Sequence, residues 1–182
     1  SKNINFQNFK KIKKVKKVNK IFENLLKDQP SFFETLKPTY KYSYSKRALS
    51  KYKKFLNIRI IGMGGSVLGS EAIHDFLKKK IKKKLTFVNN LNNNDDYLQD
   101  KNINLNLIIS KSGNTLETVA NSNTLIKKKD SNIVITENKE SYLTNLASQL
   151  KAEIFEHKNY VGGRYSVLSE VGMLPAELMN LN

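Results

Sequence analysis

The sequence predicts an α/β protein, a three-layer αβα sandwich built on a five-stranded parallel doubly wound sheet, with an N-terminal helical extension over residues 1–57. Two observations support this prediction. From residue 58 onward, short apolar runs typical of buried strands alternate with helical patterns, which indicates a parallel sheet with helices on both faces. Two of the runs end in turns rich in glycine or hydroxyl groups that lead directly into helices. The expected strand order is 2-1-3-4-5.

The N-terminal extension begins with a long amphipathic pattern over residues 3–27. Lysines fill the gaps between apolar residues that recur at spacings of three and four, and this periodicity predicts one helix. We expect the helix to pack on the domain through its apolar stripe. The alternative is a basic amphipathic helix that lies on a membrane or a nucleic acid. The apolar positions are Phe9, Ile12, Val15, Val18, Phe22, Leu25 and Leu26.

The later elements of the chain follow in order. A proline-bracketed loop over residues 30–38 leads to an extended segment of alternating tyrosines, which we expect to pack on the domain rather than to stack on bases. A helix over residues 45–55 completes the extension. Strands are predicted over residues 58–61, 85–88, 105–109, 133–136 and 153–155, with an Asn-rich loop at 89–94. Helices are predicted over residues 67–80, 115–129, 141–150 and 166–179, the last kinked or interrupted by Pro175.

Composition narrows the possible functions. The chain of 182 residues is long enough for one domain with a real core. It contains no cysteine, which excludes disulfides, thiolate zinc sites and a cysteine nucleophile. No apolar run reaches membrane-spanning length and no signal peptide is recognisable, so we expect a cytoplasmic protein without a membrane partner. The net charge is +16, but only three of the 32 basic residues are arginines, so we interpret most lysines as solvated surface that steers anionic substrates.

Two turns point to an anion site. The turn after strand 58–61 contains Gly62, Gly64, Gly65 and Ser66, and glycines at a helix start allow a ligand to approach the main chain. The turn over residues 110–115 places three hydroxyls and a glycine before a helix, where they can surround a phosphate. Plain N-capping is the structural alternative for either turn. Because both turns end neighbouring strands at the expected ligand-binding edge, a ligand site is favoured.

A third stretch follows the fifth predicted strand. In Val161–Ser166, two glycines precede Arg164 at the mouth of a helix. Arginine is always charged and can stabilise negative charge that develops on an oxygen. The alternative is an arginine that merely pairs with a carboxylate.

These three stretches resemble signatures of the glucose-6-phosphate isomerase (phosphoglucose isomerase) family. Gly62–Gly69 resembles the first signature, Ser110–Thr118 the phosphate loop in its bacterial form, and Gly162–Ser169 the third signature. The second stretch would fit any sugar isomerase (SIS) domain, whereas the third is specific to this family. Order and spacing agree over residues 58–176. The resemblance implies an SIS domain of flavodoxin-like strand order over residues 58–182.

The resemblance also implies an activity, the reversible isomerisation of glucose 6-phosphate and fructose 6-phosphate through an enediolate, in glycolysis and gluconeogenesis. Arg164 is the implied catalytic residue and would stabilise the enediolate charge. Gly65 would let the sugar lie close to the main chain, and Glu117 would orient partners rather than abstract the proton. No metal or cofactor is implied. The implied phosphate- and sugar-binding residues are Gly65, Ser66, Ser110, Lys111, Ser112, Thr115 and Glu117.

The sequence also departs from the family pattern. The family's carboxylate base, its lysine and a ring-opening histidine from the partner subunit of a homodimer lie downstream of the third signature, largely in a second SIS domain. We therefore expect this chain to be an N-terminal portion that turns over little substrate alone. His74 and His157 do not match the family's histidine, and Glu170 and Glu177 are expected to be surface or pairing groups.

Three other functions remain open at this point. The first is a non-catalytic SIS module that binds sugar phosphates, although such a module has no need for Arg164. The second is nucleic-acid binding through the lysines, which should collapse as ionic strength rises. The third is a dinucleotide-binding domain, which is disfavoured because no acidic residue ends strand 85–88 to hold a ribose.

Overall fold

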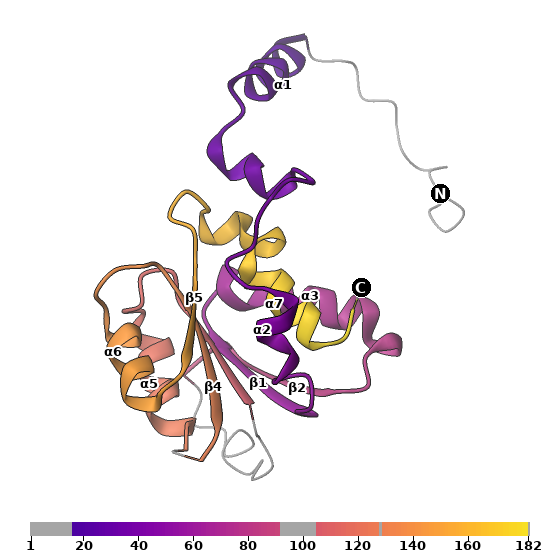
Figure 1. The fold of residues 1–182 in the computed structure, drawn as a ribbon. Coiled ribbons are helices and arrows are strands. Elements are labelled where there is room, and N and C mark those ends of the chain that lie inside the picture. Colours follow the sequence, from indigo (N-terminus) through magenta and orange to yellow (C-terminus); the bar gives the residue numbers. More distant parts are fainter. Residues whose placement is uncertain (1–15, 92–104, 128, 182) are drawn as a thin grey trace.

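The computed structural model describes residues 16–91, 105–127 and 129–181. Five strands form one parallel sheet in the order β2-β1-β3-β4-β5, which confirms the predicted topology (Figure 1). Every strand lies within two residues of its predicted bounds, and the three central strands of the sheet are buried along almost their whole length. The strands are β1 Asn57–Gly62, β2 Lys84–Val88, β3 Leu105–Ile109, β4 Ser131–Thr136 and β5 Glu153–Glu156.

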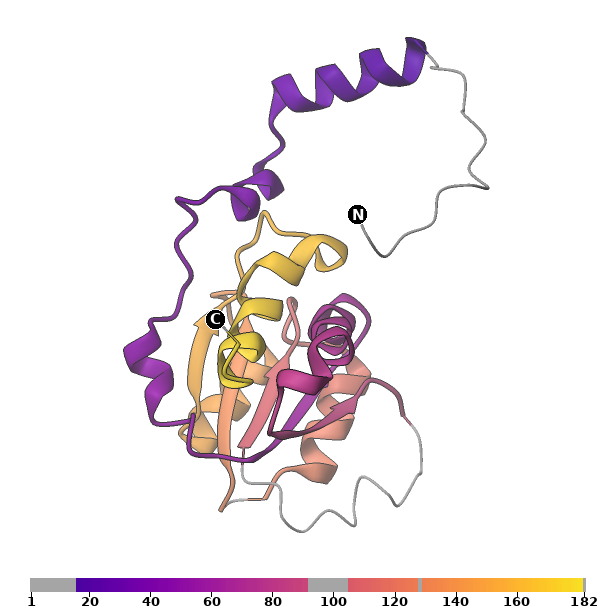
Figure 2. The ribbon, with the colours of Figure 1, turned by 90° about the vertical axis from the view of Figure 1, so that its right-hand side faces the viewer.

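Helices cover both faces of the sheet, which makes the predicted αβα sandwich. Three of them lie on one face, α2 (Lys46–Ser50), α3 (Gly65–Leu77) and α7 (Glu170–Leu178) (Figures 1 and 2). The other face is covered by α5 (Leu116–Leu125) and α6 (Tyr142–Leu150). Short 3-10 helices lie at Ser31–Leu36 (η1), Lys78–Lys80 (η2) and Gly163–Leu168 (η3).

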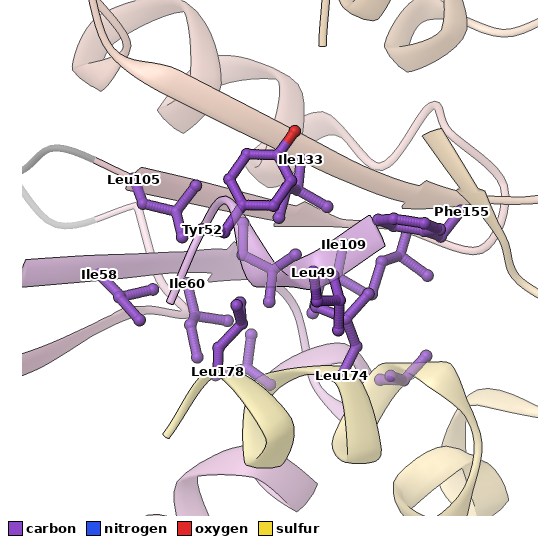
Figure 3. Packing of buried hydrophobic residues seen from close by; sticks show 14 residues of the cluster. Leu49, Tyr52, Ile58, Ile60, Leu105, Ile109, Ile133, Phe155, Leu174 and Leu178 are labelled. Atoms are coloured by element: carbon purple, nitrogen blue, oxygen red, sulfur yellow. The ribbon is translucent and has the colours of Figure 1, made fainter. Parts of the chain in front are cut away.

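The hydrophobic core consists of two clusters, one on each side of the sheet. Side chains alternate along a strand, so Ile58 and Ile60 of β1 face α7, whereas Ile61 faces α5 and α6. Leu174 and Leu178 of α7 pack directly on the first cluster (Figure 3). Both clusters are almost fully buried, and they hold the strand ends in fixed positions.

Several helix boundaries differ from the prediction. The helix predicted over 115–129 ends at Leu125, and the one over 45–55 ends at Ser50 before a series of turns. The stretch 166–179 is divided between η3 and α7 by Ser169, whose hydroxyl accepts from the Val171 amide at 3.4 Å and begins α7. Pro175 lies inside α7 and does not interrupt it, because tertiary packing of the buried helix outweighs one missing hydrogen bond.

The first described helix, α1 (Lys16–Asp28), stands apart from the sheet in both views (Figures 1 and 2). None of its residues is buried, and Val18, Ile21 and Phe22 each expose more than half of their surface. The prediction that this helix packs on the domain is therefore wrong for residues 16–28. Periodicity shows that a helix has an apolar face but does not show what covers that face. Residues 3–15 of the predicted helix lie outside the described residues.

The tyrosine segment, in contrast, packs on the domain as predicted. Tyr44 packs against the first core cluster. Glu170, fully buried at the start of α7, accepts hydrogen bonds from the Tyr40 hydroxyl at 2.9 Å and from the Ser43 amide at 2.8 Å. Burial and the Glu170 carboxylate raise the pKa of Tyr40 far above its usual range. Leu49 of α2 is also fully buried, so the second half of residues 1–57 belongs to the packed body.

A row of buried polar side chains crosses three strands near their amino ends. Arg59, Asn106 and Asn132 are in register on β1, β3 and β4, and each is at most 5% exposed. The Asn106 side chain accepts from Arg59 at 3.4 Å and donates to Asn132 at 2.9 Å, while Arg59 also donates to the Leu125 carbonyl at 2.9 Å. The row was not predicted, because it emerges only when the strands pair.

Replacing Asn106 with leucine should destabilise the protein by about 3 kcal/mol, because it leaves a buried guanidinium and a buried amide each short of one partner. Urea unfolding measures this loss. Asn121→Leu is the control, because Asn121 makes a single exposed hydrogen bond on α5. Equal midpoints for the two variants would show that the row contributes nothing to stability.

Among the described helices, none combines the length and apolarity that a bilayer crossing requires.

Candidate functional site

The turns singled out in the sequence meet at the carboxyl edge of the sheet. Gly62 at the end of β1 pairs with Ile109 at the end of β3, and Ile109 pairs with Ile135 of β4. The three segments that follow these strands therefore start side by side. The topology places them at the point where the strand order reverses.

A surface pocket of about 290 Å³ lies at this edge. Four of the predicted binding residues line it, namely Ser66, Lys111, Ser112 and Thr115. Two residues that the prediction did not include, Glu137 and Lys139, complete the lining. Gly65, Ser110, Glu117 and Arg164 do not line the pocket.

Ser110 builds the turn rather than the pocket wall. Its side chain is 1% exposed, and its hydroxyl lies 2.9 Å from the Thr115 hydroxyl and accepts from the Gly113 amide at 3.2 Å. Thr115 is the N-cap residue of α5, yet its side chain makes no capping hydrogen bond. Plain N-capping therefore does not explain why a hydroxyl is present at position 115.

Gly65 fits the first turn closely against the third. A Cβ atom at this position would overlap the backbone carbonyl of Gly163. The Ser166 hydroxyl also bridges the two segments, donating to the Gly65 carbonyl at 3.2 Å and to the Gly163 carbonyl at 2.7 Å. The close approach expected of a sugar at Gly65 is thus made in this structure by η3.

Arg164 is exposed on η3. Its guanidinium carbon lies 6.0 Å from the centre of the Tyr165 ring. On η1, the Phe32 ring stacks on Tyr165 with the ring centres 4.8 Å apart. The N-terminal extension therefore reaches the segment that carries the predicted catalytic arginine. Glu117 lies in the first turn of α5 and is only partly buried.

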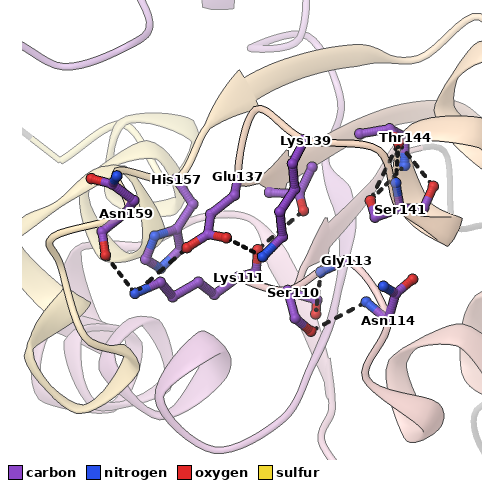
Figure 4. A network of polar contacts seen from close by, with 12 residues as sticks. Ser110, Lys111, Gly113, Asn114, Glu137, Lys139, Ser141, Thr144, His157 and Asn159 are labelled. Atoms are coloured by element: carbon purple, nitrogen blue, oxygen red, sulfur yellow. Dashed lines mark hydrogen bonds and ion pairs between the residues drawn. The ribbon is translucent and has the colours of Figure 1, made fainter.

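Lys111 and Lys139 are connected by Glu137, which immediately follows β4 (Figure 4). The Glu137 carboxylate forms an ion pair with Lys139 and lies 3.6 Å from the Lys111 ammonium, which also donates to the Asn159 carbonyl at 2.7 Å. The Lys139 ammonium is the largest cause that lowers the pKa of Glu137 below its usual range. Glu137 could have been identified from the sequence, because this residue directly follows the predicted strand 133–136, at the same edge as the two turns.

Comparison with known proteins shows the family of this chain. A sequence model of the family described as phosphoglucose isomerase matches residues 16–180, which is most of the chain. The chain belongs to the phosphoglucose isomerase family.

Curated members of the phosphoglucose isomerase family show how much of the protein this chain represents. A glucose-6-phosphate isomerase of Borrelia garinii is 36% identical over 138 residues, which cover 66% of this chain and 26% of the relative. The enzyme of Methanocaldococcus jannaschii is 37% identical over 141 residues, which cover 70% of this chain and 34% of the relative. The chain thus spans about a quarter to a third of the length of these relatives.

Solved structures show the same fold. A hypothetical protein of Thermus thermophilus matches with a TM-score of 0.72 at 21% identity, covering 91% of this chain and 44% of that one. A tagatose-6-phosphate ketose/aldose isomerase of Escherichia coli matches with a TM-score of 0.53 at 18% identity, covering 84% of this chain and 42% of that one. The sandwich is therefore the SIS-domain fold.

His157 lies beside the charged network but not in the pocket lining of this phosphoglucose isomerase domain (Figure 4). It is 2% exposed, and its Nδ1 lies 3.1 Å from the Lys158 carbonyl. Burial, followed by the repulsion of Lys111, lowers the pKa of His157 below its ordinary value of about 6.5. Burial therefore favours the neutral imidazole in the folded protein.

Replacing His157 with glutamine should reduce the loss of stability in mild acid. Below about pH 6.5 the unfolded chain binds a proton at this histidine before the folded chain does, so unfolding becomes more favourable as the pH falls toward the lowered folded-state pKa. The loss is at most about 1.4 kcal/mol for each pH unit. Urea unfolding at pH 7.5 and 5.5 measures it, with His74→Gln as the control. A His157→Gln variant that loses as much stability as the control would contradict the prediction.

Proposed function

We propose that the pocket at Ser66, Lys111, Ser112 and Thr115 binds the phosphate of glucose 6-phosphate and fructose 6-phosphate. The observation that carries this proposal is the pocket itself. Three hydroxyl side chains and two ammonium groups from three different strand ends line one hollow at the carboxyl edge of the sheet. Hydroxyls donate hydrogen bonds to phosphate oxygens, and ammonium groups balance the charge of the dianion.

The start of α5 adds to this site. Helix N-termini attract anions through their unpaired amides and the helix dipole, and Thr115 stands directly before the first turn of α5. Ser110 contributes from within the turn by fixing the Thr115 hydroxyl. In this proposal, Ser110 shapes the loop, while Ser66, Ser112 and Thr115 contact the phosphate.

Arg164 is proposed to act at the other end of the sugar. Isomerisation moves a proton between C2 and C1 through an enediolate, whose negative oxygen a guanidinium stabilises. Because η3 packs on Gly65, one residue before Ser66, a sugar whose phosphate fills the pocket can extend toward Arg164. Glu117, in the first turn of α5, is proposed to orient neighbouring groups.

The whole reaction is proposed for the longer family protein, an aldose–ketose isomerase of glycolysis and gluconeogenesis that acts as a homodimer in the cytoplasm. From the family resemblance, the carboxylate base, the ring-opening histidine and a lysine are expected beyond the third signature. The 182 residues are therefore expected to bind the sugar phosphate but to turn over little of it. A robust isomerase rate from the purified chain, free of host enzyme, would contradict this expectation.

Calorimetric titration tests the binding proposal. The chain is titrated with fructose 6-phosphate, fructose and inorganic phosphate at low and at moderate ionic strength. We expect fructose 6-phosphate to bind most tightly, inorganic phosphate more weakly and fructose not detectably, with binding that survives moderate salt. Equal binding of inorganic phosphate and fructose 6-phosphate, with a steep fall as the salt concentration rises, would instead indicate a non-specific lysine surface.

A further inference from the structure

We propose that Lys139 is a further phosphate-binding residue. Before the ligand binds, Glu137 is the counter-ion of Lys139, and the bound phosphate then replaces Glu137 as its partner. This inference rests on the proposed function. Neither residue belongs to the turns that the sequence marked as phosphate-binding, and both line the same pocket.

The backbone holds residues 137–139 against the phosphate-binding turn. The Glu137 amide donates to the Lys111 carbonyl at 3.1 Å, and the Thr136 hydroxyl lies 3.4 Å from that same carbonyl. The Lys139 amide in turn donates to the Glu137 carbonyl at 2.8 Å. The position of Lys139 relative to Ser112 and Thr115 is therefore set by main-chain hydrogen bonds rather than by a long mobile loop.

The side chains of the two lysines are held differently. The Lys111 ammonium has two acceptors, the Asn159 carbonyl and the Glu137 carboxylate, and its side chain is 33% exposed. Within the described part of the chain, the Lys139 ammonium pairs with Glu137 alone, and its side chain is 52% exposed. Lys139 is therefore the freer of the two ammonium groups at the pocket mouth.

The charges favour transfer of Lys139 to the ligand. Without ligand, the pocket lining contains two ammonium groups and one carboxylate. Glu137 remains ionised because Lys139 and Lys111 lower its pKa. A phosphate dianion presents the same kind of oxygen acceptor as a carboxylate but carries more negative charge, so the Lys139 ammonium gains by turning from Glu137 to the ligand. Glu137 and the bound phosphate then repel each other, which limits the affinity.

Titration of fructose 6-phosphate into charge variants tests both parts of the proposal. Lys139→Gln is expected to weaken binding about tenfold at low ionic strength, because one charge-assisted hydrogen bond is lost. Lys139→Arg should restore most of the affinity, because the positive charge is kept. Glu137→Gln is expected to tighten binding about threefold, because a like charge is removed. The matched controls are Lys79→Gln and Glu140→Gln, which change exposed charges outside the pocket lining and should leave the affinity unchanged.

Each outcome is informative. If Lys139→Gln binds like Lys79→Gln while the unmodified chain binds well, the role of Lys139 is refuted and the proposed function stands. If Glu137→Gln binds no more tightly than the unmodified chain, the counter-ion role of Glu137 is refuted. If the unmodified chain does not bind fructose 6-phosphate, the proposed function itself fails, and this inference fails with it. Far-UV circular dichroism confirms that each variant is folded.

Discussion

Replacing Gly65 with alanine is expected to destabilise the protein by about 3 kcal/mol, whereas Gly163→Ala should change its stability by less than about 0.5 kcal/mol. The new methyl group at position 65 would overlap the Gly163 carbonyl, a backbone atom that cannot turn aside. At position 163 a Cβ atom would meet nothing within 4 Å. Inside a helix, alanine is otherwise more stabilising than glycine by about 1 kcal/mol. The loss of stability expected at position 65 therefore comes from the clash alone.

Urea unfolding of the two variants measures this difference. The same samples are titrated with fructose 6-phosphate, because a displaced η3 should also disturb the neighbouring Ser66. Equal unfolding midpoints for Gly65→Ala and Gly163→Ala would mean that η3 does not rest on α3 as the structure shows.

Replacing Thr115 with valine is expected to weaken fructose 6-phosphate binding at least about tenfold, while Thr118→Val leaves binding unchanged. Both changes remove one hydroxyl and keep a β-branched side chain of nearly the same volume. Thr115 lines the pocket and its hydroxyl pairs with Ser110. Thr118 lies one turn further along α5, fully buried, and its hydroxyl has no hydrogen-bond partner among the described residues.

The two valine variants should also differ in stability. Thr118→Val should stabilise the fold by about 1 kcal/mol, because an unpaired buried hydroxyl is replaced by a methyl group. Thermal unfolding and calorimetric titration on the same samples measure both effects. If Thr115→Val binds fructose 6-phosphate as tightly as Thr118→Val does, the phosphate does not bind at Thr115.

The fold could be predicted because its signals are local. Strands such as Leu105–Ile109 are buried on both faces, so they appear as runs that are apolar at all but one position, and their alternation with helices leaves few topologies. Whether α1 packs on the domain could not be predicted in this way. Its apolar stripe is clear from the sequence, but Phe22 and its neighbours remain exposed in the described structure.

The site could be predicted only in part, because some of its properties depend on how segments distant in the sequence pack together. The sequence cannot distinguish the buried Ser110 from the exposed Ser112, since both are serines of one turn. Glu137 and Lys139 carry no motif and enter the pocket only because β4 pairs with β3. Arg59 and Asn106 look like polar interruptions of strands until the register brings them together.

The location of the phosphate can be measured most directly by amide chemical-shift perturbation in NMR spectra recorded during a titration with fructose 6-phosphate. We expect the largest shifts at residues 110–115 and 137–139 and at Ser66, the segments that meet around the pocket. Shifts concentrated instead on the lysine-rich segment 78–84, with the amides of residues 110–115 unmoved, would contradict the account.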